Sequence, residues 1–78
     1  MPIHEIIVYT LPSCAYCKQV KKYLKAKKLI FQEVDVHEDP KLQAEMIGKS
    51  GQYGVPVLDI NGQVIVGFQK NVLDLLFD

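Results

Sequence analysis

The chain of 78 residues lacks the features that mark several classes of protein. Its only two cysteines, Cys14 and Cys17, are too few for a small secreted protein stapled by disulfides. Its nine lysines are balanced by nine acidic residues, which excludes a uniformly basic nucleic-acid binder. No apolar run approaches the ~20 residues that span a bilayer, and the N-terminus shows no basic and then apolar signal pattern.

The remaining composition predicts one small domain, residues 1–78, located in the cytoplasm. Apolar residues make up 49% of the chain, enough for a thin core and too many for a disordered tail. Because the cytoplasm keeps thiols reduced, a C-x-x-C pair there indicates catalysis or metal binding rather than a structural bridge. We expect a monomer without nucleic-acid or membrane partners.

Hydrophobic periodicity predicts four strands. They fall at 5–10, 30–36, 55–60 and 63–66, where β-branched and aromatic runs or apolar–polar alternation occur. Asn61-Gly62, between the last two, is the preferred two-residue turn of a β-hairpin.

Three helices are predicted between and after these strands. They cover 15–27, Pro40 to Gly48 or Gly51, and the segment that follows Asn71. Asp39 and Asn71 are the expected N-caps, and Asp74 resembles the second half of a capping box. The expected apolar residues of the second and third helices are Leu42, Met46, Ile47, Val72, Leu73, Leu75, Leu76 and Phe77. The resulting order, βαβαββα, begins with a strand–helix–strand unit, which favours parallel pairing of the first two strands.

The cysteine pair lies where the first strand is followed by the first helix. At that junction, unpaired backbone N–H groups and the helix dipole favour a thiolate over a thiol at Cys14. Lys18 and Lys21 add positive charge nearby. Cys17 lies almost one turn further along, on the apolar face of the helix, where it is less exposed. This asymmetry predicts that Cys14 attacks as the nucleophile and that Cys17 resolves the mixed disulfide.

A metal site is the alternative chemistry for the same pair. Structural zinc takes four ligands, and only His4 and His37 add soft ligands, neither at finger-like spacing. Small metal-delivery domains also place C-x-x-C between a first strand and a first helix, but in the order βαββαβ. Here a helical segment at 40–47 follows the second strand, so the element order favours redox chemistry. A metal or iron–sulfur carrier remains the alternative of another class.

Pro56 opens the third predicted strand, although proline cannot donate a hydrogen bond to a sheet. This suggests either an edge strand or a special backbone conformation, such as a cis peptide bond after Val55. A cis bond would turn the backbone of Val55 outward. Its N–H and C=O could then pair with an extended substrate lying across Cys14.

Several motifs follow one another along nearly the whole chain. They are V-Y-T-x-P-x-C-x-Y-C at 8–17, E-M-I-x-x-S-G at 45–51, V-P at 55–56, N-G at 61–62 and Gly67 before the last helix. C-x-x-C alone is weakly specific, whereas this combination is strongly specific. The sequence resembles a small glutaredoxin of the thioredoxin superfamily.

This resemblance implies a thioredoxin-like fold in which a four-stranded mixed sheet is flanked by three helices. It implies reduction of protein or glutathione mixed disulfides, with Cys14 and Cys17 as the reacting thiols and Pro56 as a cis-proline facing them. The implied groove for glutathione or substrate is lined by Tyr16, Gln52, Val55, Gly67 and neighbours. Phe68 belongs either to this groove or to the core, and Tyr53 could flank the groove. No tightly bound cofactor is expected, and glutathione is the expected co-substrate.

The sequence departs from the common glutaredoxin pattern at two places. Ala15 follows the first cysteine where dithiol glutaredoxins commonly have proline, and Leu11 stands where lysine is frequent. Segment 66–71, V-G-F-Q-K-N, lacks the acidic residue of the family's glutathione clamp. The V-G-F form is similar to glutaredoxin-like redoxins that take electrons from a thioredoxin reductase and reduce protein disulfides, such as that of ribonucleotide reductase. Such a thioredoxin-like electron donor is the alternative function.

Six of the nine lysines fall within residues 18–28. They could steer acidic partners or the carboxylates of glutathione toward Cys14. Lys18 and Lys21 are close enough in sequence to the thiols for this role. The other four are expected to form a solvated helix face: Lys22, Lys25, Lys27 and Lys28.

Overall fold

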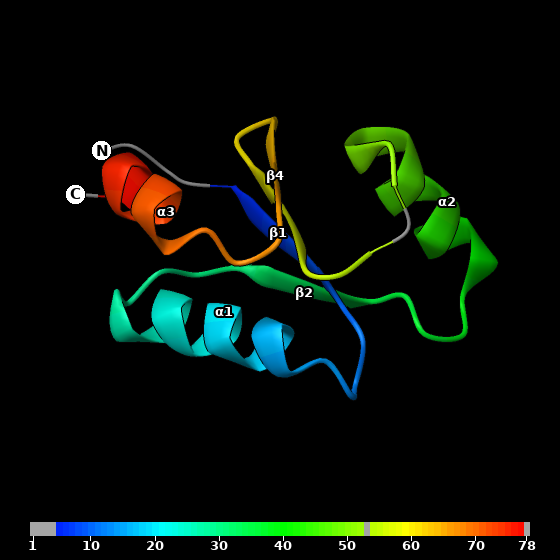
Figure 1. Cartoon of the computed structure of the whole chain (residues 1–78), viewed down its shortest axis with the longest axis horizontal. Coiled ribbons are helices and arrows are strands. Elements are labelled where there is room, and N and C mark those ends of the chain that lie inside the picture. The colour runs from blue at the N-terminus through cyan, green and yellow to red at the C-terminus, as the bar shows by residue number, and fades with distance from the viewer. Residues whose placement is uncertain (1–4, 53, 78) are drawn as a thin grey trace.

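The computed structural model describes residues 5–52 and 54–77. The chain folds in the predicted order βαβαββα (Figure 1). The elements are β1 (Ile6–Thr10), α1 (Ala15–Ala26), β2 (Gln32–Asp35), α2 (Pro40–Ser50), β3 (Val57–Ile60), β4 (Gln63–Val66) and α3 (Lys70–Phe77). Within the described residues, no helix is long and apolar enough to cross a membrane.

The four strands form one mixed sheet in the order β2-β1-β3-β4. β1 and β2 pair in parallel, as predicted, with Thr10 opposite Asp35 at their ends, while β3 pairs antiparallel to β1, and β4 to β3. The carboxyl ends of β1 and β2 therefore meet the amino end of β3. This end of the sheet, which we call the Cys14 end, brings together the loop before Cys14, the loop after β2, and Pro56.

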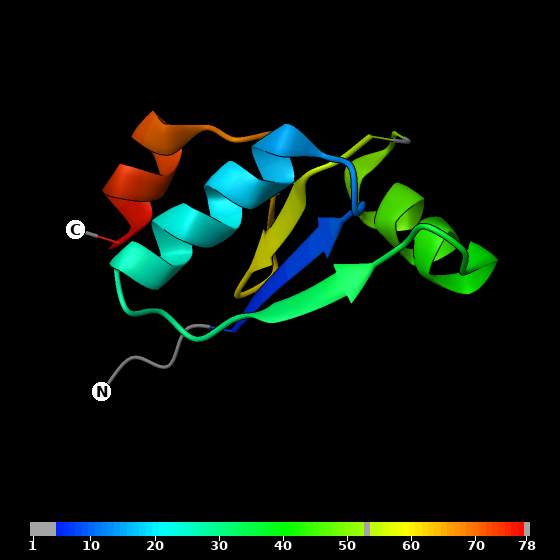
Figure 2. The same ribbon diagram turned by 90° about the horizontal axis from the view of Figure 1, so that it is seen from below.

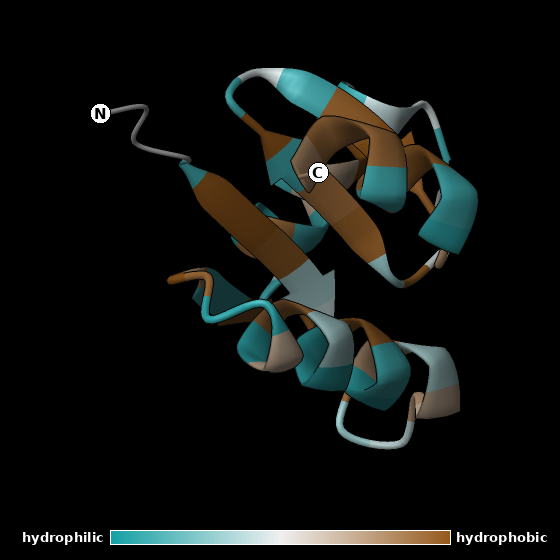
Figure 3. Ribbon diagram, turned by 90° about the vertical axis from the view of Figure 1, so that its left-hand side faces the viewer, coloured by the Kyte–Doolittle hydropathy of each residue, from teal (hydrophilic) through white to brown (hydrophobic). Residues whose placement is uncertain are grey.

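Alternation along the strands divides the core between the two faces of the sheet. Ile6 and Val8 of β1 pack with α1 and α3, whereas Ile7 and Tyr9 pack on the side of α2. Figure 2 shows α1 and α3 together on one side of the sheet and α2 on the other. β1 is a largely apolar ribbon, whereas the helices carry both polar and apolar residues (Figure 3). The fold is the predicted four-stranded sheet with three helices.

The ends of α2 form as the sequence predicted. The side chain of Asp39 accepts hydrogen bonds from the backbone N–H groups of Lys41 and Leu42, at 3.0 and 3.4 Å. Pro40 occupies the first helical position, where its missing N–H has no helical partner to lose. Gly51 ends the helix with φ of 75°, in the left-handed region that glycine adopts without a steric cost.

The prediction for the start of α3 was wrong. The helix begins at Lys70, so Asn71 lies inside its first turn and does not cap it. The side chain of Gln69, just before the helix, donates a hydrogen bond to the carbonyl of Val66 at 2.7 Å. Asp74 accepts hydrogen bonds from the Tyr23 hydroxyl and the Lys70 ammonium, and so joins α3 to α1 instead of completing a capping box.

Three predicted apolar positions do not pack as expected. Ile30 is 89% exposed because β2 begins only at Gln32, and Leu75 is 84% exposed on the outer side of α3. Ile47 is 39% exposed, whereas Met46 beside it is fully buried. One helix face packs against the sheet, so neighbouring apolar residues cannot all be buried.

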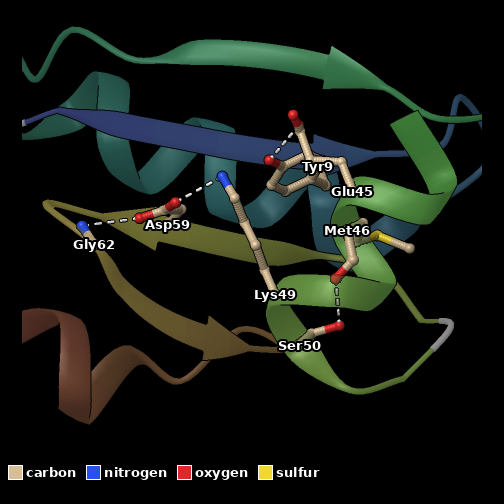
Figure 4. A network of polar contacts seen from close by, with 7 residues as sticks. All are labelled: Tyr9, Glu45, Met46, Lys49, Ser50, Asp59 and Gly62. Atoms are coloured by element: carbon tan, nitrogen blue, oxygen red, sulfur yellow. Dashed lines mark hydrogen bonds and ion pairs between the residues drawn. The ribbon is translucent and has the colours of Figure 1, made fainter. Parts of the chain in front are cut away.

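A polar network ties α2 to the sheet (Figure 4). The Tyr9 hydroxyl donates to Glu45 Oε2 at 2.6 Å, and Lys49 Nζ donates to Asp59 Oδ2 at 2.7 Å. Lys49 Nζ also lies 5.2 Å from the centre of the Tyr9 ring. Asp59 accepts a second bond from the Gly62 N–H at 2.9 Å, which holds the β3–β4 turn. Burial, and second the bond with Glu45, raises the pKa of Tyr9, so the hydroxyl keeps its proton and remains a donor.

Candidate active site

Cys14 is the N-cap of α1, directly after the loop that ends β1. Its backbone is extended (φ −84°, ψ 114°), and its N–H donates to the carbonyl of Leu11 at 3.2 Å. Its Sγ accepts a hydrogen bond from the backbone N–H of Cys17 at 3.1 Å. The residue is half-buried and its thiol is free. The sulfur therefore lies at the N-terminus of α1, in contact with a backbone N–H donor and close to the positive end of the helix dipole.

Cys17 has a different environment, although its thiol is also free. The residue is 1% exposed, on the buried face of α1. Burial, and second the hydrogen bond with Cys14, raises the pKa of the Cys17 thiol from 9.0 to about 12. The backbone of Leu11 and the ammonium of Lys21 act in the opposite direction. Cys17 is thus a protonated, enclosed thiol at neutral pH, beside a more exposed one.

Pro56 and Gly67 meet at the Cys14 end of the sheet. The Val55–Pro56 peptide bond is cis, which is the special conformation that the sequence offered as the alternative to an ordinary edge strand. The N–H of Gly67 donates to the carbonyl of Pro56 at 2.8 Å, and Gly67 has φ of 80°. Val55 and Leu11 both pack against the core cluster on the α2 side of the sheet. The chain on either side of Pro56 is thereby held next to the loop that leads to Cys14.

The other predicted groove residues occupy varied positions. Tyr16 is 63% exposed in the first turn of α1. Gln52 is exposed, and its backbone N–H and C=O both bond to Ser50 Oγ, at 3.3 and 2.9 Å. Phe68 packs edge-on against Tyr23 of α1, with ring centroids 6.0 Å apart, so it contributes to the core on that side. A role in substrate binding stays a prediction for each of them, and Tyr53 lies outside the described residues.

Lys21 belongs to a network that the sequence did not reveal. Lys21 Nζ lies 2.9 Å from Glu33 Oε2, which also accepts a bond from the Thr10 hydroxyl at 3.2 Å. The hydrogen bond from Lys21 lowers the pKa of Glu33. The sequence signal that could have placed Thr10 and Glu33 together on the α1 side is the parallel pairing of the first two strands, along which side chains alternate between the two faces of the sheet. Lys18 is exposed and forms no salt bridge with any described residue.

A metal site would need several ligand side chains that converge on one point. Among the residues that the structure describes, no three or more His, Cys, Asp and Glu side chains converge as a metal site would require. His37 Nε2 lies 3.8 Å from Glu38 Oε1, in the loop after β2. His4 lies outside the described residues.

The chain is similar to several known proteins over most of its length. The family model for glutaredoxin matches residues 6–65. A glutaredoxin-like 8.6 kDa protein in the rubredoxin operon of Clostridium pasteurianum is 45% identical over 73 residues, which cover 94% of this chain and 97% of that protein. Glutaredoxin 3 of Escherichia coli K12 is 37% identical over 63 residues, covering 81% of this chain and 76% of that one.

A solved structure matches the whole architecture as well. The crystal structure of the thioredoxin-like protein BC3987 superimposes with a TM-score of 0.85 at 35% identity. The match covers 92% of this chain and 99% of that one, so no large element is added or lost in either. With the cysteine pair at the start of α1 and a cis-proline at the same end of the sheet, the chain belongs to the glutaredoxin family.

Proposed function

We propose that the protein is a thiol–disulfide oxidoreductase that reduces protein disulfides or glutathione mixed disulfides. The observation that carries this proposal is the asymmetry of its two free thiols. Cys14 is half-buried and caps α1, while Cys17 is 1% exposed with its pKa raised to about 12. An accessible nucleophile next to a protected thiol suits a reaction in two steps.

In the first step, the Cys14 thiolate attacks one sulfur of the target disulfide. A Cys14–target disulfide forms, and the second target sulfur leaves as a thiolate that takes a proton. In the second step, Cys17 loses its proton to water or to the departing thiolate and attacks Cys14 Sγ. The target leaves fully reduced, two electrons have been transferred, and Cys14 and Cys17 are joined by a disulfide. The reaction uses only these two thiols and no bound cofactor, and it takes place in the cytoplasm on a monomer.

The source of electrons for the next cycle is either glutathione or a thioredoxin reductase. Segment 66–71 favours the second source. It contains no acidic side chain that could pair with the amino group of glutathione, and its Phe68 packs against Tyr23 of α1. Lys70 is paired with Asp74 at 3.0 Å. The similarity to a thioredoxin-like protein, 99% of which the match covers, also supports a thioredoxin-like electron donor as the second candidate function.

One assay compares the two sources directly. The oxidised protein is mixed with glutathione in one reaction and with NADPH plus a thioredoxin reductase in another, and the rates of Cys14–Cys17 reduction are measured. Cys14→Ser should abolish reduction of a protein disulfide in either system. Full activity of Cys14→Ser would contradict the proposed reaction, whichever reductant is faster.

The metal-carrier alternative is tested separately. Freshly purified protein, kept anaerobic, is analysed for copper, zinc and iron. A stoichiometric metal that is lost in both Cys14→Ser and Cys17→Ser would replace the proposal with a carrier function.

A further inference from the structure

A strip of lysines runs along the exposed side of α1. Lys18, Lys22 and Lys25 are all exposed and follow one another at i, i+4 and i+7. This spacing places them on one side of the helix, over a rise of about 10 Å. The strip begins one turn after Cys14 and extends away from the Cys14 end of the sheet.

The lysine strip forms no salt bridge within the described part of the chain. Four other lysines form salt bridges, namely Lys21, Lys27, Lys49 and Lys70. None of the three strip lysines does, although Lys25 influences Glu33 through space. Helix α1 itself contains no acidic residue.

This arrangement opposes the stability of the helix. Like charges three or four residues apart destabilise a helix by a few tenths of a kcal/mol per pair, and Lys18–Lys22 and Lys22–Lys25 are such pairs. Lys18 also places a positive charge near the positive end of the helix dipole. A solvent-exposed helix face that mixed lysines with acidic residues would be equally soluble. The presence of positive charges alone on this face therefore indicates a role other than folding of the helix.

The strip also has a shape that a ligand can occupy. Its three lysines, together with Lys21 and Ala26, line a surface hollow of about 520 Å³. The hollow is open to solvent along the helix. It can hold several side chains of an extended polypeptide, whose alternate residues are spaced by about 7 Å, close to one helical turn.

The loop after β2 restricts the class of partner. Asp35, Glu38 and Asp39 lie at the Cys14 end of the sheet, because β2 ends opposite Thr10 of β1. They line their own hollow with His37 and Leu42. A nucleic acid carries phosphates along its whole length and would be repelled by this loop near Cys14. A polypeptide can carry acidic residues only where it meets α1.

We propose that Lys18, Lys22 and Lys25 dock an acidic segment of the protein whose disulfide Cys14 attacks. This inference rests on the proposed function, and it extends that function from chemistry to substrate choice. The docked segment holds the target disulfide near Cys14. The acidic loop after β2 repels a target that carries acidic residues on the side of its disulfide away from α1.

The test uses two peptides that share one internal disulfide and differ in one extension. One extension alternates Asp with Ser, and the other alternates Asn with Ser. Reduction is followed with the wild type, with Lys22→Gln/Lys25→Gln, and with Lys28→Asn/Lys41→Gln as a control that removes the same charge. Asn is used at Lys28 because its φ of 59° is one that Asn tolerates. Lys18 is left unchanged because it is close to the thiols.

The wild type should reduce the acidic peptide with a KM roughly fivefold lower than that of the neutral peptide, at low salt. Lys22→Gln/Lys25→Gln should remove most of this preference, whereas the control variant should keep it. High salt should remove it in every variant. Equal KM values for the two peptides in the wild type, or an equal loss in both double variants, would overturn the inference. The inference would also be overturned if a single-stranded oligonucleotide competed more strongly than the acidic peptide at equal charge. If neither peptide is reduced at all, the proposed function itself fails.

Discussion

The difference between the two thiols predicts a large difference in their rates of alkylation. The perturbation is treatment of the reduced protein with iodoacetamide at about pH 7, where only thiolates react at a useful rate. Cys14 should be alkylated quickly, because it lies at the start of α1 and is partly exposed to the reagent. Cys17 should remain unmodified on the same time scale.

The expected size of this protection follows from the pKa of Cys17. A thiol with a pKa of about 12 instead of 9.0 has roughly 1,000-fold less thiolate at neutral pH, which corresponds to about 4 kcal/mol. Since the side chain is also enclosed, with 1% of the residue exposed, access adds to this factor. Alkylation of Cys17 in the folded protein should therefore be slower than in the unfolded chain by a factor on the order of 1,000.

Mass spectrometry of the digested protein measures both rates, because a cleavage after Tyr16 separates the two cysteines. Urea at a concentration that unfolds the protein is the control, and there the two rates should converge. In Cys14→Ser, Cys17 should stay slow, since burial is the largest cause of its raised pKa. Alkylation of Cys17 before Cys14 in the folded protein, or at an equal rate, would refute the assignment of roles.

Two further predictions concern stability. Lys49→Met removes the salt-bridge partner of Asp59, whose side chain is only 14% exposed, and should lower the free energy of unfolding by about 1–3 kcal/mol in urea. The same change at exposed Lys41 should cost less than about 0.5 kcal/mol, and equal effects would contradict the structural role of the network. Because the hydrogen bond from Lys21 lowers the pKa of Glu33 below 4.5, that carboxylate stabilises the fold above this pH, and its contribution is lost on acidification. Glu33→Gln should therefore lose less stability than the wild type between about pH 6 and pH 3, and identical losses would show that the pair contributes nothing.

The fold was largely predictable because local signals agree along the chain. Strand runs, the Asp39 cap, Gly51 and the Asn61-Gly62 turn each act over a few residues, and all specify the observed elements. Boundaries were less predictable where packing decides them. Asn71 is a good cap by composition, but Gln69 bonds back to the carbonyl of Val66, and α3 begins at Lys70, two residues earlier than predicted.

The cysteine pair was predictable for the same local reason, since its position relative to β1 and α1 sets its environment. The contacts that surround it depend on residues far apart in sequence. Glu33 reaches Lys21 and Thr10 only because β2 pairs in parallel with β1. Tyr9 and Glu45 are likewise 36 positions apart, so no local pattern joins them.

In the proposed reaction, Cys14 attacks the target and Cys17 releases it. The most direct measurement is to mix Cys17→Ser with a disulfide-containing target protein and determine the mass of the product without reductant. We predict a stable one-to-one adduct joined through Cys14, and no adduct with Cys14→Ser. An adduct that forms through Cys17 in Cys14→Ser at the same rate, or none in Cys17→Ser, would contradict it.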